Sequence, residues 1–171
     1  MFHNLVGKTI LITGASSGIG RSTAFEFARC SPQSLRLILT ARRIEVLKKV
    51  AAEINAEVGN EVKILSVQLD VSRPEDIHGF LEKLPEEWRD IDVLVNNAGL
   101  ALGGMAKSPS ISPADIDIMF ATNVTGLINM TQAMLPTMLR RNKGDIINLN
   151  SIAGHEAYPG GVASTAPLNP Q

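Results

Sequence analysis

The 171-residue chain has very few residues that form covalent cross-links or aromatic clusters: one Cys, one Trp and one Tyr. Because a lone cysteine, Cys30, cannot form an intramolecular disulfide, nothing in the sequence calls for an oxidising compartment. The sequence also lacks a basic and apolar leader, and no apolar run approaches the roughly 18 residues that span a bilayer. We therefore expect a soluble, cytoplasmic protein with no membrane partner.

The chain also lacks an excess of charge of either sign. Its 16 Lys and Arg residues against 17 Asp and Glu residues give a formal net charge of -1. Nucleic acids and anionic lipids are bound by clustered positive charge, so we expect neither as a partner and take a small molecule as the default. With 44% hydrophobic residues, the length suits one domain with a sizeable core.

Short apolar runs alternate with helical periods along most of the chain. The apolar runs predict strands at 9–13, 35–40, 62–67, 92–96 and 145–150. The helical periods predict helices at 18–29, 45–58, 74–84, with Ser72 as a candidate N-cap, and 114–140. Continuously apolar strands between such helices are typical of parallel strands covered on both faces. The sequence therefore predicts an α/β fold, a doubly wound, Rossmann-like parallel sheet of about five strands.

The last residues of the chain differ in composition from the rest. From Pro159 onward the sequence is rich in Pro, Gly, Ser, Ala and Thr, without a charged residue or a helical period. We expect an irregular tail over 159–171. The predicted domain accordingly covers residues 1–158.

A glycine-rich turn joins the first predicted strand to the first predicted helix. Its spacing is G-x-x-x-G-x-G, from Gly14 to Gly20. Glycines let the backbone approach a ligand closely, and a helix N-terminus offers unpaired N–H groups to phosphate. The turn therefore predicts a dinucleotide site whose candidate contacts are Gly14, Ser16, Ser17, Gly18, Ile19 and Gly20.

Two other interpretations of this turn stay open. The same residues satisfy G-x-S-x-G, the nucleophile elbow of α/β hydrolases, with Ser16 as the nucleophile. A hydrolase needs a positioned base, and only His78 and His155 lie downstream, neither in a convincing context. The second alternative is a turn without a ligand, which the flanking strand and helix disfavour.

The end of the second predicted strand distinguishes between the two nicotinamide cofactors. Sites for NAD usually have an acidic residue about 20 positions after the last glycine, which binds the ribose hydroxyls. This chain has Thr40-Ala41-Arg42-Arg43 there, without a carboxylate. Two guanidinium groups can pair with a 2′-phosphate, so Arg42 and Arg43 favour NADP. The alternative is a basic helix start that is merely exposed to solvent.

Taken in order, the motifs resemble the short-chain dehydrogenase/reductase family across nearly the whole chain. Besides the glycine turn, the similar segments are Leu69-Asp70-Val71, Asn96-Asn97-Ala98-Gly99, Asn123 and Ser151. The resemblance implies that Asp70 meets the adenine and that Asn97, Ala98, Gly99 and Asn123 also bind cofactor. It further implies that Asn123 and Ser151 belong to the catalytic tetrad. The segment from Asn150 to Gly160 is most similar to fungal NADP-dependent 3-hydroxy-acid or serine dehydrogenases.

Serine and asparagine suit these roles chemically. Oxidation of an alcohol needs hydride transfer to a nicotinamide and removal of the hydroxyl proton. The Ser151 hydroxyl can hold the developing carbonyl oxygen and Asn123 can hold a water, but neither is a base. In the family the base is the tyrosine of a Tyr-x-x-x-Lys turn, whose lysine lowers the pKa of the phenol.

This tyrosine and lysine are missing from the chain. The family's spacing places them at positions 164 and 168, where the sequence has Ser164 and Leu168. The lone tyrosine, Tyr158, has Val162 four residues on and precedes Pro159, so we interpret it as a loop residue on the substrate side.

We therefore expect an NADP-dependent oxidoreductase by ancestry, truncated near Gly161, whose family substrate is a small hydroxy acid or another alcohol or carbonyl compound. We predict little or no dehydrogenase activity for the chain as given. The alternative is a non-catalytic NADP-binding or interaction protein. We predict no metal site.

The family continues with a helix and two strands that the sequence lacks. The predicted helix 114–140 has Met130, Met134 and Met138 at i, i+4 and i+8. We expect the side that bears them to lack the cover it has in the family. Methionines at this spacing are typical of a core or of a subunit interface, and an interface would allow homo-oligomer formation. We expect the fifth strand to be an open edge.

Overall fold

A single parallel sheet organises the chain, as seen in a computed structural model that describes residues 5–102 and 111–151. The strand order is β3-β2-β1-β4-β5, and every neighbouring pair is parallel. The strands are β1 (Thr9–Thr13), β2 (Arg36–Ala41), β3 (Lys63–Gln68), β4 (Val93–Asn96) and β5 (Asp145–Asn148). The predicted α/β fold with five parallel strands is confirmed for the described residues.

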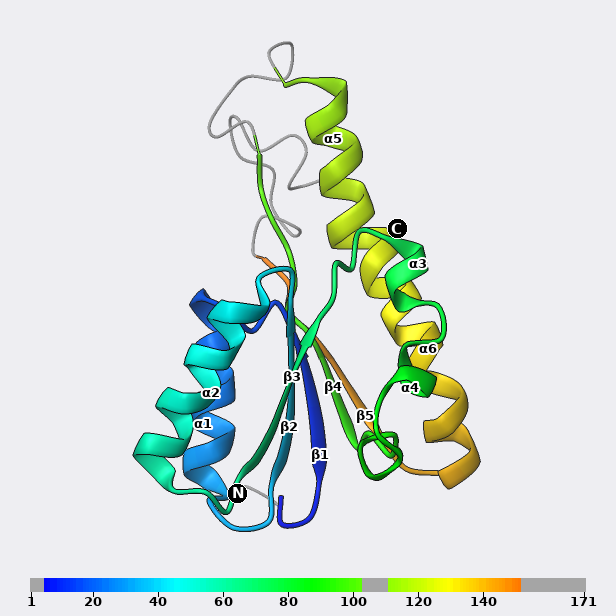
Figure 1. Cartoon of the computed structure of the whole chain (residues 1–171). Coiled ribbons are helices and arrows are strands. Elements are labelled where there is room, and N and C mark those ends of the chain that lie inside the picture. The colour runs from blue at the N-terminus through cyan, green and yellow to red at the C-terminus, as the bar shows by residue number, and fades with distance from the viewer. Residues whose placement is uncertain (1–4, 103–110, 152–171) are drawn as a thin grey trace.

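Helices cover both faces of this sheet (Figure 1). One face carries α1 (Gly18–Cys30) and α2 (Ile44–Val58). The other carries α6 (Leu127–Arg141) with the short helices α3 (Pro74–Ile77) and α4 (Phe80–Lys83). A 3-10 turn, η1 (Glu86–Trp88), precedes β4, and α5 (Pro113–Phe120) projects beyond the carboxyl ends of the strands.

The central strand β1 separates two apolar cores. Its Ile10 and Ile12 pack with residues of α1 and α2, whereas Leu11 packs with residues of α6. Successive side chains of a strand point to opposite faces, so a strand between two helix layers must be apolar at every position. All three side chains are fully buried. The continuous apolar runs in the sequence thus follow from double coverage.

The methionines of α6 belong to the second core. Met130, Met134 and Met138 are at most 5% exposed and pack in one cluster with Leu11 and Leu94. The prediction that the side bearing them lacks cover is wrong, because their spacing marks the face of the helix that contacts the sheet.

The exposed apolar residues of α6 lie on its other side. They are Ile128, Leu135 and Leu139.

The predicted helix 74–84 is two short helices. The first, α3, ends at Ile77, and Gly79 adopts a φ of +66° before α4 begins. Glycine reaches this left-handed region without the steric cost that a Cβ brings, so the chain bends there. The prediction of Ser72 as N-cap is also wrong. Arg73 occupies the N-cap position, and the Ser72 hydroxyl instead donates to Asp70 Oδ1 at 2.7 Å.

The predicted helix 114–140 is an unbroken run of helical residues, but the type of helix changes along it. It begins at Pro113, where the capping Ser112 hydroxyl accepts a hydrogen bond from the Asp115 N–H at 3.1 Å. Between α5 and α6 lies a π-helical segment, η3 (Ala121–Gly126). Such one-turn insertions occur frequently at functional sites. The candidate residue Asn123 lies within this one.

A charge cluster closes the amino end of the sheet. The buried Asp92 accepts a hydrogen bond from the Thr9 N–H at 3.0 Å through Oδ2. Its Oδ1 lies 2.8 Å from Lys143 Nζ and 3.3 Å from Arg141 Nη1. The carboxylate therefore joins the starts of β1 and β4 to the end of α6 and the turn before β5.

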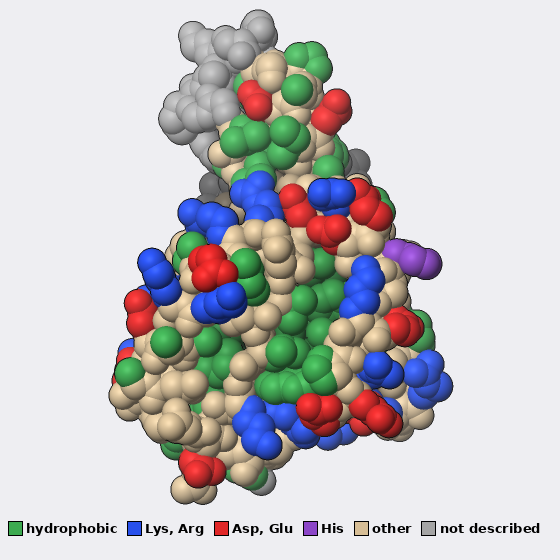
Figure 2. Space-filling model, in the orientation of Figure 1, with side chains coloured by type: hydrophobic (Ala, Val, Ile, Leu, Met, Phe, Trp, Pro, Cys, Tyr) green, Lys and Arg blue, Asp and Glu red, His purple; other side chains and the backbone are tan. Residues whose placement is uncertain are grey.

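The two edges of the sheet are partly exposed. Within the described ranges β5 pairs with β4 alone, as predicted for an open edge, and its Ile147 is 44% exposed. At the other edge, Figure 2 shows hydrophobic side chains gathered in front of β3, whose Leu65 and Val67 are half-buried. In the part of the chain that the structure describes, no helix is long and apolar enough to cross a membrane.

Several predictions fall outside the described residues. These concern the domain boundary at 158, the irregular tail 159–171, Tyr158, Ser164 and Leu168.

Candidate functional site

A cavity of about 380 Å³ opens at the carboxyl ends of β1, β2, β3 and β4. It lies where the strand order reverses between β1 and β4, the usual position of ligands in open α/β sheets. Its lining is Gly14, Ser16, Ser17, Gly18, Ile19, Ala41, Arg42, Arg43, Leu69, Asp70, Val71, Asn97, Ala98, Gly99, Leu100 and Thr122. Most of the candidate cofactor contacts are therefore brought together in one place.

The glycine turn fits tightly against the segment that follows β4. Gly14 has a φ of +67°, and a Cβ there would lie 2.8 Å from the Ala98 Cα. A Cβ on Gly20 would collide with the Asn97 amide and the Gly14 carbonyl. The Asn97 side chain in turn donates to the Thr13 and Gly14 carbonyl oxygens at 2.8 and 3.2 Å. Gly20 thus supports the cavity from behind without lining it.

The hydroxyl of Thr13 joins these two segments. Its Oγ1 accepts hydrogen bonds from the Asn97 N–H at 3.0 Å and the Ala98 N–H at 2.9 Å, and donates to the Val95 carbonyl at 3.3 Å. One donor and two lone pairs are all that a hydroxyl offers, and all are used. The sequence analysis missed this residue.

The N-terminus of α1 faces the cavity without a negative charge of its own. Its first turn reads Gly18-Ile19-Gly20-Arg21 and contains no carboxylate. The N-cap Ser17 makes no side-chain capping bond, and a Cβ on Gly18 would meet nothing within 4 Å. The first N–H groups of the helix and its positive dipole end therefore make this part of the cavity suitable for an anion.

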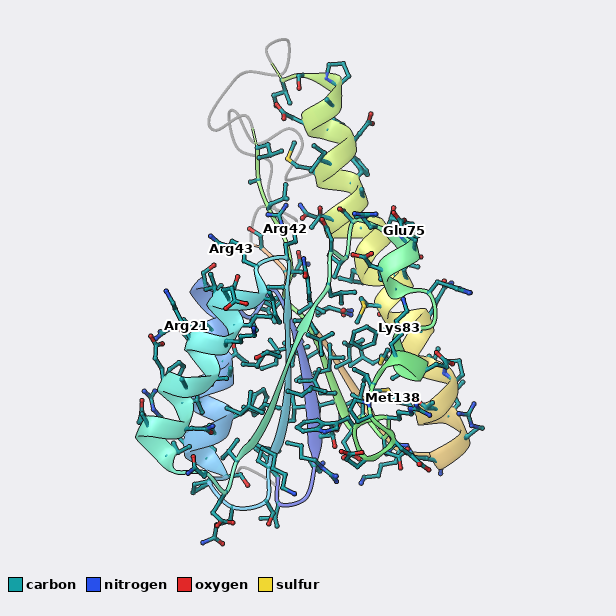
Figure 3. The ribbon with its side chains drawn as sticks, viewed as in Figure 1. Arg21, Arg42, Arg43, Glu75, Lys83 and Met138 are labelled. Carbon is teal, nitrogen blue, oxygen red and sulfur yellow. The ribbon has the colours of Figure 1, made fainter. Side chains whose placement is uncertain are left out.

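Arg42 and Arg43 supply positive charge at the end of β2. Both are exposed and line the cavity, and neither joins an ion pair within residues 5–102 and 111–151. Figure 3 shows them apart from Arg21, which pairs with Glu53 at 2.6 Å. Figure 2 shows Lys and Arg side chains gathered at this level of the molecule. Arg43 is also the N-cap of α2, and its role in binding a phosphate stays a prediction.

Asp70 organises the wall that follows β3. Its Oδ1 accepts hydrogen bonds from the Ser72 N–H at 3.0 Å and the Ser72 hydroxyl at 2.7 Å, and its own N–H donates to Asp76 at 3.2 Å. Among the described residues its Oδ2 accepts no hydrogen bond. Leu69 and Val71, which flank it, are buried and line the same cavity.

Asn123 lies behind the cavity lining. Its Oδ1 accepts from the Leu100 N–H at 2.9 Å, and its Nδ2 donates to the Leu100 carbonyl at 2.8 Å. The amide thereby fixes the backbone of a residue that lines the cavity. The predicted role of Asn123 in holding a water stays a prediction.

Ser151 is not brought to the cavity lining. It is the last described residue before 152–171, it is exposed, and its N–H donates to Asn150 Oδ1 at 2.8 Å. Its predicted catalytic role stays a prediction. The lining residues that the sequence analysis missed are Ala41, Leu69, Val71, Leu100 and Thr122. Ala41, Leu69, Val71 and Leu100 each come soon after a predicted strand, and this is the one feature of the sequence that could have identified them. Thr122 has no such feature.

The hydrolase alternative finds no support in the geometry. His78 lines a different groove, between the α3–α4 segment and α6, whereas Ser16 lines the cavity at the strand ends. His155 lies outside the described residues. Within the described part of the chain, Ser16 therefore shares its cavity with no histidine that could act as its base.

A parallel sheet with a glycine turn at its switch point defines a dinucleotide-binding domain of the Rossmann type. Residues 8–166 match the family model of the short chain dehydrogenases, and the chain belongs to this family. It is 52% identical over 157 residues to an NADP-dependent 3-hydroxy acid dehydrogenase of Schizosaccharomyces pombe, covering 92% of this chain and 59% of that protein. It is 44% identical over 153 residues to a serine 3-dehydrogenase of Rhizobium radiobacter, covering 90% and 57%.

Solved structures give the same picture. The crystal structure of serine dehydrogenase from Escherichia coli superposes with a TM-score of 0.79 at 42% identity, covering 92% of this chain and 68% of that one. A closed form of serine dehydrogenase complexed with NADP+ gives 0.80 at 42% identity, covering 92% and 60%. The chain spans 57–59% of the length of the two sequence relatives named above.

Proposed function

We propose that the cavity binds NADP(H). The observation that carries the proposal is the presence, in one cavity, of two arginines that form no ion pair with the described residues and a helix N-terminus without a carboxylate in its first turn. The pyrophosphate would lie at the start of α1 and the 2′-phosphate against Arg42 and Arg43. Two of the proteins named above support this choice. The Schizosaccharomyces pombe relative is named an NADP-dependent dehydrogenase, and one solved serine dehydrogenase is complexed with NADP+.

The remaining walls suit the rest of the cofactor. Asp70 offers a carboxylate oxygen that accepts no hydrogen bond from the described residues, which fits the amino group of adenine. Leu69 and Val71 offer apolar surface to the base. Opposite them, Asn97, Ala98 and Gly99 complete the lining without adding a charge.

We propose that the site descends from one for hydride transfer between NADP(H) and a small hydroxy acid, or another alcohol or carbonyl compound. The names of the relatives support the hydroxy-acid class. When bound, the nicotinamide supplies the carbon that accepts or donates hydride. Ser151 would hold the substrate oxygen, and Asn123 would keep Leu100 in place.

The chain as given has, on this proposal, little or no dehydrogenase activity. Ser164 and Leu168 stand where the family has its tyrosine and lysine. Loss of a general base alone removes about 10²- to 10⁴-fold of rate. Purified chain incubated with NADP and L-serine or 3-hydroxy acids should form no NADPH above background. Robust turnover would contradict this proposal.

A second candidate is a non-catalytic NADP-binding or interaction protein in a reducing compartment. The observation that favours it is that the described residues form the cavity, whereas Ser164 and Leu168 stand in place of the family's tyrosine and lysine. Homo-oligomer formation through α5 and α6 would use the exposed Ile128, Leu135 and Leu139. Translation of the downstream coding region separates the candidates, because a Tyr-x-x-x-Lys frame favours an enzyme cut short.

Fluorescence titration with NADPH and NADH tests the cofactor proposal. Replacing Arg42 and Arg43 with Ala should weaken NADPH binding at least about tenfold and leave NADH binding nearly unchanged, because only NADPH carries the 2′-phosphate. Lys48→Ala with Lys49→Ala is the matched control, since it removes the same charge from the exposed face of α2. Absence of NADPH binding by the unmodified chain would refute the proposal.

A further inference from the structure

The π-helical segment η3 touches two walls of the cavity. Thr122 lines the cavity, Asn123 holds the backbone of Leu100, and Gly126 rests on the backbone of Val71. Leu100 follows β4 and Val71 follows β3, and the sheet separates these strands by β2 and β1. Figure 1 shows the segment after β3 crossing over to the junction of α5 and α6. One short element therefore spans the cavity between walls that come from distant strands.

The contact at Gly126 leaves no room for a side chain. A Cβ there would lie 2.5 Å from the Val71 carbonyl oxygen, 3.1 Å from the Val71 carbonyl carbon and 3.1 Å from the Ala121 carbonyl oxygen. Gly126 is buried. Because every obstacle is backbone, no change of rotamer relieves the collision. Any side chain would have to displace either η3 or the wall.

The wall cannot yield at Val71 alone. Asp70 accepts hydrogen bonds from Ser72 through its side chain and from the Arg73 N–H through its carbonyl at 3.0 Å. Val71 is 8% exposed and packs in the same core cluster as Met130, one helical turn after Gly126. A displacement at Val71 is therefore transmitted to Leu69 and Asp70, which line the cavity beside it.

We propose that Gly126 is a positioning residue for the cofactor. Its missing side chain lets η3 lie directly on Val71, so that one rigid segment fixes the spacing between the wall after β3 and the wall at Leu100. The proposal rests on the proposed binding of NADP(H), and it concerns the adenine end of that ligand.

The test compares Gly126→Ala with two controls, using 2′,5′-ADP, which carries the adenine end alone, as the titrated ligand. Gly126→Ala should bind it about tenfold more weakly, because overpacking against backbone displaces the wall. Thr125→Ala, an exposed change in the same segment, should bind within about twofold of the unmodified chain. Met134→Ala, a core change away from the cavity, should lower the unfolding temperature without changing affinity.

The outcomes separate positioning from stability. Unchanged affinity in a folded Gly126→Ala protein overturns the proposal for Gly126 and leaves the NADP site standing. Failure of the unmodified chain to bind 2′,5′-ADP refutes the NADP site itself, and the role of Gly126 with it.

If Gly126→Ala shows no cooperative unfolding, the contact is tested in the unmodified chain by amide hydrogen exchange. Added 2′,5′-ADP should then slow exchange over 127–131, none of which line the cavity, as well as over 69–73. Protection confined to the lining residues would overturn the proposal.

Discussion

Replacing Asp92 with asparagine should destabilise the fold strongly at neutral pH and hardly at all in acid. Burial by itself raises the pKa of Asp92. The hydrogen bonds from Lys143 and the Thr9 N–H, with the charges of Lys143 and Arg141, outweigh burial and hold the pKa below its ordinary value. A depressed pKa means that the folded state favours the carboxylate, so this stability is present above the unfolded-state pKa of about 4. It is lost as pH falls through the folded-state pKa.

The magnitude follows from the contacts. The single amide oxygen of an asparagine either accepts from the Thr9 N–H, which turns the NH₂ group toward two cations, or faces the cations as a neutral oxygen, which turns the NH₂ group toward the Thr9 N–H. Hydrogen bonds to charged groups contribute about 1.5–3 kcal/mol each, but Lys143 is 58% exposed and its share must be discounted for solvent screening. We expect a loss of about 2 kcal/mol in the free energy of unfolding, or roughly 4–8 °C in Tm.

Urea denaturation at a series of pH values measures this effect. The control is Asp90→Asn, whose carboxylate is 77% exposed and lies 3.7 Å from Arg141 Nε. It should cost less than about 0.5 kcal/mol. The difference between the unmodified chain and Asp92→Asn should shrink below about pH 4. A difference that is constant with pH, or equal to that of Asp90→Asn, would refute the reasoning.

Further substitutions test the packing around the glycine turn and on the inner face of α6, each by urea denaturation. Gly20→Ala forces a Cβ into the Asn97 amide and should cost about 1–3 kcal/mol and weaken NADPH binding. Thr13→Val leaves two partly buried N–H groups without their acceptor and should cost about 2–4 kcal/mol, whereas a loss under 1 kcal/mol would contradict the hydrogen bonds described. Met134→Ala should cost about 2–5 kcal/mol and Leu135→Ala, 38% exposed, much less; equal costs would contradict the assigned helix face.

Much of the fold could be predicted because the deciding signals are local. Ile10, Leu11 and Ile12 are apolar in succession because helices lie on both faces of β1, and that pattern is visible without coordinates. The break at Gly79 is different, since a glycine also occurs within unbroken helices and only its φ of +66° shows the bend. Periodicity likewise identified the methionine face of α6 without telling what covers it.

The same distinction between local and long-range signals applies to the residues of the site. The glycine turn and Arg42 with Arg43 are short motifs that the sequence shows directly, and apart from Gly20 the predicted contacts in them line the cavity. Thr13, Leu100 and Thr122 were missed because their importance comes from partners far away in the sequence. The π-helical segment around Asn123 likewise contacts residues distant in the sequence, Leu100 on one side and Val71 on the other.

The positions of the cavity-lining residues along the chain have a consequence for the synthesis of the protein. Among the described residues, all those that line the cavity lie between Gly14 and Thr122. A ribosome releases the chain from its N-terminus, so these described lining residues are synthesised before β5. Completion of the cavity lining and synthesis of β5 are therefore separate stages, and a ligand that binds the cavity would begin to stabilise the first stage before the second exists.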